Sequence, residues 1–327
     1  MEQALEPRAA ETGPSLRGHL AICRFDHWFK NVFVLPGVVV ALGMEPERLT
    51  LALVPCLLLG LLAIGIVASS NYVINEVLDA PFDRNHPDKC RRPVPSGRVH
   101  IPLAYMQWIA LAILGIGLGA LINTGFALTM LALWLAGCAY NLRPLRTKDL
   151  PYVDVLSESL NNPLRMLAGW FIVAPHAFPP ASLLLSYWMI GGYFMAMKRL
   201  AEMRHIGAER AAAYRRSFAH YDESSLLVTV MFYASSSMLF LGAFIMRYRL
   251  ALILATPLVA LVMALYMRIG LREDSPVQHP EQLYRERLFV AVTAACALAL
   301  GFCMFVDASF LGPWFAPTAP TDPNAIP

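Results

Sequence analysis

The chain has 327 residues, of which 57% are hydrophobic and only 15% are charged, and its formal net charge is +3. In soluble domains about a quarter of the residues are charged, so this composition excludes an ordinary soluble protein. The small net charge gives no indication of a nucleic-acid partner. The six cysteines form no C-x-x-C pair, which argues against a zinc site or a disulfide framework. The composition therefore predicts an all-α integral membrane protein.

Nine apolar stretches approach or exceed the length of about 20 residues that a helix needs to cross a bilayer. We expect transmembrane helices at 31–44, 51–77, 102–121, 125–141, 152–174, 181–201, 223–246, 250–269 and 288–311. They predict one membrane domain over 24–311, with a polar segment at 1–23 and a Pro-rich disordered tail at 312–327.

Lys and Arg residues are concentrated in every second loop. The loops at 78–101, 142–151, 198–222 and 268–287 carry three to six Lys or Arg each, whereas the intervening loops carry at most two. By the positive-inside rule, this asymmetry places the N-terminus and the basic loops in the cytoplasm and the C-terminus outside. We expect a multi-pass protein of a bacterial inner membrane.

Polar residues recur every fourth position at the end of the second stretch, at Asn71, Asn75, Asp79 and Asp83. A step of four residues drifts only about 40° around a helix, so the first three share one face. That face is expected to point into the bundle, because a carboxylate facing lipid is costly. Carboxylate and amide oxygens near a membrane surface suit Mg²⁺. Pro81 leaves open whether Asp83 lies beyond a kink, and a solvated helix end is the alternative interpretation.

A dense group of cations follows these carboxylates. Its members are Arg84, Lys89, Arg91, Arg92 and Arg98. Arg grips phosphate with two parallel hydrogen bonds, so we interpret the group as phosphate ligands, with Arg84 and Lys89 nearest to Asp83. Positive-inside topology alone would also place several cations here.

Two further polar groups interrupt apolar stretches. In the fifth stretch Glu158, Asn161, Asn162 and Arg165 follow one helical face, as a substrate site or as a polar ladder that joins helices. In the sixth, Lys198, Arg199 and Glu202 end a long apolar helix, as catalytic groups or as a routine ion pair.

The remaining candidates lie at the same predicted membrane side. Tyr140 and Lys148 close and follow the fourth stretch, and Lys30 and Asn31 begin the first. An interfacial Tyr is more often an anchor in the aromatic belt. A metal site, a cationic surround and an apolar interior together fit a transferase that handles a water-soluble phosphate and a lipid chain, with Mg²⁺ neutralising a leaving diphosphate.

The motif N-E-x-x-D-x-x-x-D-R from Asn75 to Arg84, with "HPDKCRRPVPSGRV" behind it, resembles the first aspartate-rich motif of the UbiA superfamily of intramembrane prenyltransferases. The resemblance extends from about Arg24 to Arg287. It implies a ring of about nine transmembrane helices around a central cavity. It also implies that Asn75, Asp79 and Asp83 bind Mg²⁺ and diphosphate.

The chain departs from ordinary members of that superfamily in one respect. Between Tyr193 and Glu223 it has no second D-x-x-x-D motif and carries "KRLAE" at 198–202 instead. With "FDHWFKN" and "REDSPVQHPEQLYRE", this looks like the polyprenyl-phosphate phosphoribosyltransferase subgroup. Such a resemblance implies phosphoribosyl pyrophosphate as the donor and a polyprenyl phosphate as the nucleophile.

Two alternatives stay open at this point. One is prenyl transfer from a prenyl diphosphate to an aromatic acceptor, and the other is a lipid transporter or flippase. A transporter would often show repeated halves, and no such repeat is evident. The lipid chain length, the general base and homo-oligomerisation are not determined by the residues.

Overall fold

The computed structural model describes residues 13–84, 89–207, 210–211, 215–273, 275–278 and 280–315. Residues 312–315 form a short helix, and the rest of the predicted Pro-rich tail lies outside the described residues, as does the start of the polar N-terminal segment.

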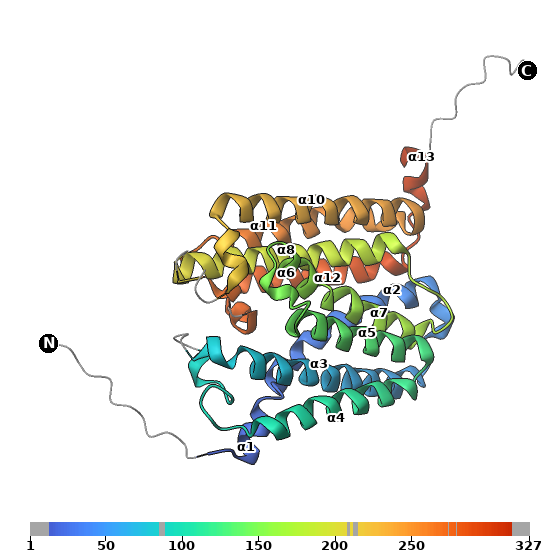
Figure 1. Ribbon diagram of the computed structural model, residues 1–327. Helices are drawn as coiled ribbons and strands as arrows, with labels where there is room; N and C mark the ends of the chain where they lie inside the picture. Colours follow the sequence, from blue (N-terminus) through green and yellow to red (C-terminus); the bar gives the residue numbers. More distant parts are fainter. Residues whose placement is uncertain are drawn as a thin grey trace, which may run out of the picture.

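Helices make up the described part of the chain, in which no strand occurs (Figure 1). The α-helices are α1 (Leu16–Ala21), α2 (Leu35–Met44), α3 (Leu53–Asp83), α4 (Ile101–Ala120), α5 (Thr124–Asn141), α6 (Val153–Ser159), α7 (Asn161–Val173), α8 (Ala181–Ile206), α10 (Glu223–Tyr248), α11 (Thr256–Gly270), α12 (Arg287–Phe305) and α13 (Gly312–Phe315). Two 3₁₀ segments matter for the site, η1 (Phe25–Val34) and η4 (Thr147–Asp149). The predicted all-α fold is confirmed.

Seven helical stretches of the described chain are long and apolar enough to cross a membrane. They are Leu16–Met44, Leu53–Asp83, Ile101–Ala120, Thr124–Asn141, Glu223–Tyr248, Leu250–Gly270 and Arg287–Phe305. The predicted fifth span is divided into α6 and α7, which are 7 and 13 residues long, and α8 is long but less apolar. The count of nine therefore stays a prediction.

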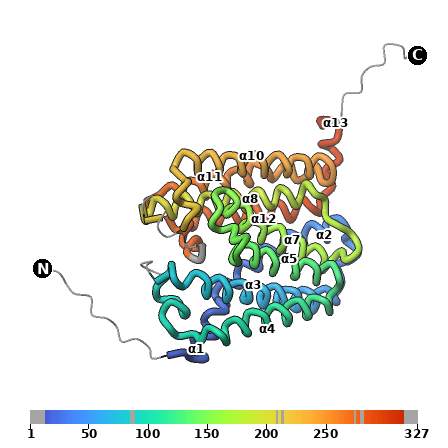
Figure 2. Tube along the Cα trace, in the orientation of Figure 1, coloured from blue at the N-terminus to red at the C-terminus, as the bar shows by residue number. Residues whose placement is uncertain are grey.

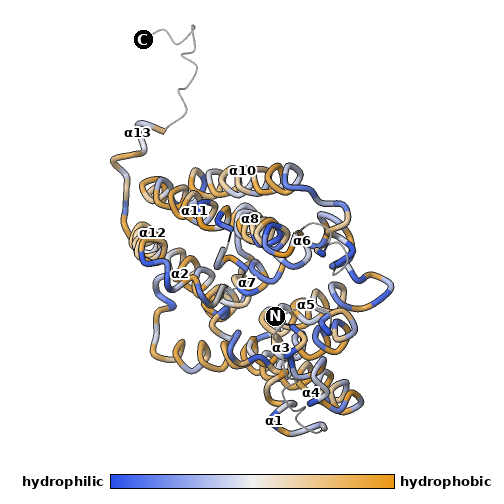
Figure 3. The backbone as a smooth tube through the Cα atoms, turned by 90° about the vertical axis from the view of Figure 1, so that its left-hand side faces the viewer, coloured by the Kyte–Doolittle hydropathy of each residue, from blue (hydrophilic) through white to orange (hydrophobic). Residues whose placement is uncertain are grey.

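The helices lie side by side in a bundle. Figure 1 shows α8, α10, α11 and α12 on one side and α3 and α4 on the other, with α5 and α7 between them. The Cα tube of Figure 2 shows their axes roughly aligned. Hydrophobic residues run along most helices, and hydrophilic residues gather where loops join them (Figure 3). This distribution fits a bundle whose outer surface faces lipid.

Small residues allow close approach inside the bundle. A Cβ added at Gly37 of α2 would collide with the Met166 carbonyl oxygen of α7, and one added at Gly169 of α7 would collide with the Val34 carbonyl oxygen. Glycine lets the two backbones touch, as is common between membrane helices. The segment that follows Arg24 is thereby held against the bundle interior.

The long helix α3 carries the predicted metal motif. It is 31 residues long, is not interrupted by Pro81, and ends at Asp83. Asp83 therefore belongs to the same helix as Asn75 and Asp79, and its orientation is decided by what packs around the last turn.

Candidate active site

A cavity of about 750 Å³ opens among the ends of α3, α5 and α8. Its other walls come from η1, the segment at 89–98, α6 and the segment after α8. Nine Lys and Arg side chains and five Asp and Glu side chains are among the described residues that line it. The cavity is therefore suited to anions, and its volume lies in the range of ligand sites.

Asn75 and Asp79 both face this cavity from α3. Asn75 donates a hydrogen bond to Asn141 Oδ1 at 2.6 Å, and Asp79 Oδ1 accepts from Lys148 Nζ at 2.5 Å and from Arg146 Nη2 at 3.2 Å. No described residue bonds the amide oxygen of Asn75 or the second oxygen of Asp79. Two oxygen donors thus remain available to a cation.

Lys148 supports Asp79 from the loop that follows α5. It is 2% exposed and also donates to Asn141 Oδ1 at 2.9 Å. Burial lowers the pKa of the Lys148 ammonium to about 8, and the Asp79 carboxylate opposes that shift. Lys148, which was predicted to bind substrate, therefore contacts Asp79 directly and is not among the described residues that line the main cavity.

Asp83 is fully buried and does not line the cavity with Asn75 and Asp79. Its Oδ2 accepts a hydrogen bond from Arg92 Nη1 at 2.7 Å, and Asp83 is absent from the described lining. Among the described residues no three His, Cys, Asp or Glu side chains converge as a metal site. The residues present nevertheless fit Mg²⁺, because that ion is commonly held by one or two protein oxygens together with phosphate oxygens and water. Asn75 and Asp79 are the residues that would hold it.

A buried carboxylate on α3 fixes the cationic segment that follows the helix. Glu76 is 3% exposed, and its Oε1 accepts the Val94 N–H at 2.9 Å. Four cations reach the cavity lining from this segment, namely Lys89, Arg91, Arg92 and Arg98. Four of the five predicted phosphate ligands are therefore brought to one space.

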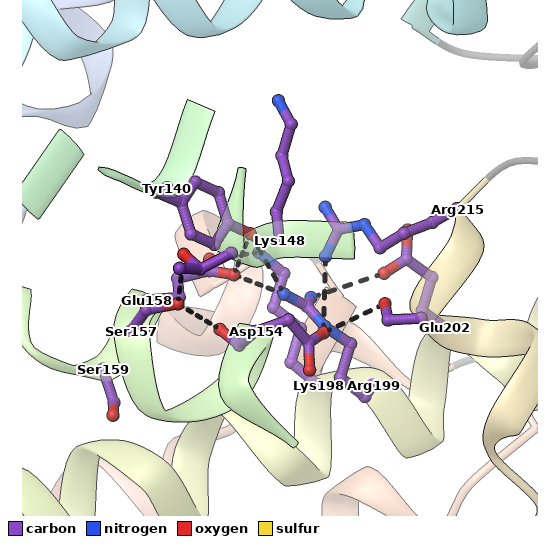
Figure 4. Close-up of polar contacts among 12 residues, drawn as sticks. Tyr140, Lys148, Asp154, Ser157, Glu158, Ser159, Lys198, Arg199, Glu202 and Arg215 are labelled. Carbon is purple, nitrogen blue, oxygen red and sulfur yellow. Dashed lines mark hydrogen bonds and ion pairs between the residues drawn. The ribbon is translucent and has the colours of Figure 1, made fainter. Parts of the chain in front are cut away.

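The opposite wall is organised around Arg199 of α8, which is 1% exposed (Figure 4). Its Nε donates to Asp154 Oδ2 at 2.9 Å, it forms an ion pair with Glu158, and its Nη1 lies 3.7 Å from Glu202 Oε2. Lys198 Nζ lies 3.9 Å from Glu158 Oε1 and faces the cavity. The predicted group of Lys198, Arg199 and Glu202 is thus part of a charged network that spans α6 and α8.

An ion pair joins the two walls. Lys89 Nζ, from the segment after α3, donates to Glu202 Oε1 of α8 at 3.2 Å. Tyr140 of α5 donates to Glu158 Oε2 at 2.8 Å and lines the cavity. Tyr140 therefore has a polar partner in the site, which an interfacial anchor would not require.

Sequence reasoning missed Asp154, which is fully buried. Besides Arg199 it accepts hydrogen bonds from Tyr221 Oη at 2.5 Å and from Ser217 Oγ at 3.3 Å. Burial raises the pKa of the Tyr221 hydroxyl above its usual range, and the Asp154 carboxylate raises it further. The i, i+4 spacing of Asp154 and Glu158 was the available signal, since both project from one helical face.

Lys30 faces the cavity from η1 and lies within 3.3 Å of His27 Nδ1. Arg84, in contrast, is exposed at the end of α3 and is not among the described lining residues. Arg84 and Lys89 were predicted together as the phosphate ligands nearest to Asp83. Of the two, only Lys89 is among the described residues that line the cavity.

The remaining predicted substrate-binding residues lie between helices, outside the described cavity lining. Asn31 donates to the Leu61 carbonyl oxygen at 3.4 Å, and Asn71 donates to the Leu133 carbonyl oxygen at 2.9 Å. Such hydrogen bonds join neighbouring membrane helices.

Two candidates on α7 have a similar position. Asn162 packs against Gly191 of α8, so closely that a Cβ added at Gly191 would lie 2.6 Å from Asn162 Nδ2. Arg165 is 6% exposed. Their positions fit the polar ladder that the sequence offered as the alternative.

The sequence pattern of the UbiA prenyltransferase family matches residues 32–292. The decaprenyl-phosphate phosphoribosyltransferase of Mycobacterium tuberculosis is 29% identical over 213 residues, which cover 64% of this chain and 67% of that protein. The enzyme of the same name from Corynebacterium glutamicum is 29% identical over 220 residues, or 64% of this chain and 61% of that protein. The solved structure of a UbiA homolog from Archaeoglobus fulgidus, bound to DMAPP and Mg²⁺, has a TM-score of 0.68 at 22% identity and covers 88% of this chain and 99% of that one. The helical arrangement is therefore shared with that structure.

Proposed function

The chain belongs to the UbiA prenyltransferase family and is a transferase, and we propose that it transfers the phosphoribosyl group of phosphoribosyl pyrophosphate to a polyprenyl phosphate, with Mg²⁺ and with release of diphosphate. The observation that carries this proposal is the wall formed by α6 and α8. Lys198 and Arg199 stand there, and the neighbouring carboxylates Glu158 and Glu202 are already paired with cations.

This wall favours a second phosphate over a second metal. The carboxylates of the α6 and α8 wall, Glu158 and Glu202, are bound to Arg199, Lys198 and Lys89, whereas Asn75 and Asp79 each keep an open oxygen for a metal ion. One such site serves one diphosphate. The surplus of Lys and Arg in the lining then suits an additional phosphate monoester, which is the head of a polyprenyl phosphate.

The reaction follows from these two sites. Mg²⁺, when bound at Asn75 and Asp79, would neutralise the charge of the diphosphate. A phosphate oxygen of the lipid forms a bond to the anomeric carbon of the ribose while the bond from that carbon to diphosphate breaks, and the electron pair leaves with diphosphate. Lys89 and Arg92 face the same cavity as Asp79 and stabilise the charge that grows on the leaving group. No general base is required, because the attacking oxygen is already an anion.

We place the cavity at the cytoplasmic side of a bacterial inner membrane. The basic loops supply its walls, and the positive-inside rule puts such loops in the cytoplasm. A soluble phosphorylated sugar would then reach the site from the cytosol, and the lipid would enter from the bilayer.

The experiment compares two labelled donors. Membranes containing the protein are incubated with a polyprenyl phosphate and phosphoribosyl pyrophosphate labelled in the ribose, or with a labelled prenyl diphosphate and an aromatic acceptor. We expect the ribose label to enter the lipid extract. Entry of the prenyl label alone would replace the proposal with prenyl transfer.

A pair of variants tests the α8 wall. Lys198→Ala is expected to lower kcat/KM for the ribose donor or the lipid phosphate by about tenfold or more, because a charge-assisted contact is lost. Arg247→Ala removes an exposed cation at the end of α10 and serves as the matched control. Equal activity of the two variants would contradict a substrate contact at Lys198.

A further inference from the structure

A second, smaller pocket shares part of its wall with the main cavity. Its volume is about 130 Å³, and its walls are the last turns of α3, the loop between α5 and α6, and the residues that follow α8. Asp79 and Arg215 line both spaces. We name it the rear pocket. It has room for several water molecules or a small anion, whereas a lipid chain needs far more space.

Positive charge dominates the rear pocket. Two carboxylates, Asp79 and Asp149, face five cations, which are Arg143, Arg146, Lys148, Arg215 and Arg216. Arg143 and Arg216 are exposed, and neither forms a hydrogen bond or an ion pair with any residue that the structure describes. No carboxylate of the described residues therefore neutralises the charge of these two guanidinium groups.

Two cations stand at the boundary between the two spaces. Lys148 Nζ and Arg146 Nη2 both contact Asp79 Oδ1, at 2.5 and 3.2 Å, and Arg146 Nε donates to Asp149 Oδ2 at 2.9 Å. The Arg146 guanidinium carbon also lies 5.6 Å from the centre of the Phe82 ring, a cation–π contact that helps to hold the side chain. A guanidinium has five N–H donors, so Arg146 can contact an anion while keeping a carboxylate partner.

We propose that the rear pocket binds inorganic diphosphate and is the route by which diphosphate leaves the main cavity; the second part rests on the proposed function. A leaving anion beside Asp79 first meets Lys148 and Arg146, and then the exposed Arg143 and Arg216. Each step exchanges one set of charge-assisted contacts for another, so the anion is never left without cationic partners. The headgroup of an anionic lipid shares this phosphate chemistry and is the competing occupant.

Saturation binding of radiolabelled inorganic diphosphate to the purified full-length protein tests the assignment. Because the main cavity also binds anions, we expect two sites per chain in the unmodified protein. The double variant R143Q/R216Q is expected to keep one site and to lose the other, or to weaken it by at least about tenfold. The double variant R247Q/R268Q removes the same charge from exposed positions outside both cavities and is expected to keep both sites.

A single site in the unmodified protein would overturn the proposal, as would unchanged two-site binding in R143Q/R216Q. In a parallel arm, the protein is placed in nanodiscs of neutral or anionic phospholipid. Loss of a preference for anionic lipid in R143Q/R216Q, with diphosphate binding intact, would assign the pocket to a headgroup and overturn it too. The single variant R143Q replaces the double variant if the latter fails to fold.

The outcome is separable from that of the proposed function. Phosphoribosyl transfer and prenyl transfer both release diphosphate, so the binding result does not depend on which donor is used. Conversely, the donor experiment decides the reaction without reference to the rear pocket. In the steady state, R143Q/R216Q is expected to show weaker product inhibition by inorganic diphosphate, by about tenfold, which a merely structural role would not produce.

Discussion

Replacing Asp154 by alanine would remove the carboxylate that joins three segments of the site. The side chain is fully buried on α6, and it accepts hydrogen bonds from Arg199 of α8 and from Ser217 and Tyr221 in the segment before α10. After the substitution Arg199 would keep Glu158 as its main partner, but the contacts to the segment before α10 would be lost.

The expected loss of stability follows from these contacts. Removing one partner of a buried ion pair costs about 3–5 kcal/mol, because the remaining charge stays buried. Glu158 and Glu202 still neutralise Arg199 in the variant, so we expect the lower end, about 3 kcal/mol, or on the order of a hundredfold in the unfolding constant. Asp154→Asn keeps an acceptor oxygen and is expected to lose about 1.5 kcal/mol.

Reversible unfolding in mixed detergent micelles measures these differences. Glu223→Ala is the matched control, since Glu223 also pairs with an α8 arginine, Arg204, but its side chain is 50% exposed. Exposed pairs contribute only about 0–1 kcal/mol. If Asp154→Ala and Glu223→Ala destabilised the protein equally, the buried network would not hold the segments together as argued. Activity of Asp154→Asn above that of Asp154→Ala would show that the acceptor positions Arg199.

Three further outcomes are expected. Asp79→Asn should abolish turnover or greatly raise the Mg²⁺ concentration that turnover requires, because the substitution removes the negative charge of the open oxygen pair. The Mg²⁺ requirement is measured by titrating activity, and an unchanged requirement would contradict this site. Asp83→Asn should change the Mg²⁺ requirement less and the unfolding free energy more, because Asp83 is buried, pairs with Arg92 and is itself not among the described lining residues. Both quantities are measured on one preparation, and the reverse order would place Asp83 on the metal. Gly37→Ala should destabilise the protein by about 1–3 kcal/mol, because the added Cβ collides with the facing backbone. Gly242→Ala is the control, since no atom lies within 4 Å of a Cβ added there. Equal unfolding midpoints of the two variants would refute the close helix contact.

Much of the helical architecture was predictable because a bilayer accepts few solutions. Long apolar runs must form helices there, and polar side chains within them must face protein. The bounds of α4, α5 and α10 follow the predicted apolar stretches within two residues, whereas the end of α3, the start of α11 and the end of α12 differ by six residues. The division of the fifth span into α6 and α7 was less visible, since Pro163 sits within the first turn of α7 and is tolerated there.

Helical periodicity acts over a few residues, so it was enough to predict that Asn75 and Asp79 share an inward helical face and that Lys198, Arg199 and Glu202 end a long helix. Which charges meet depends on the packing of distant helices. Arg199 is paired with carboxylates of α6 that are 45 and 41 residues distant, and Lys89 with Glu202 across 113 residues. The turn of Asp83 towards Arg92, the burial of Asp154 and the sharing of Asp79 between two cavities have the same origin. Such pairings depend on how the helices pack, and local periodicity carries no information about partners so far apart in the chain.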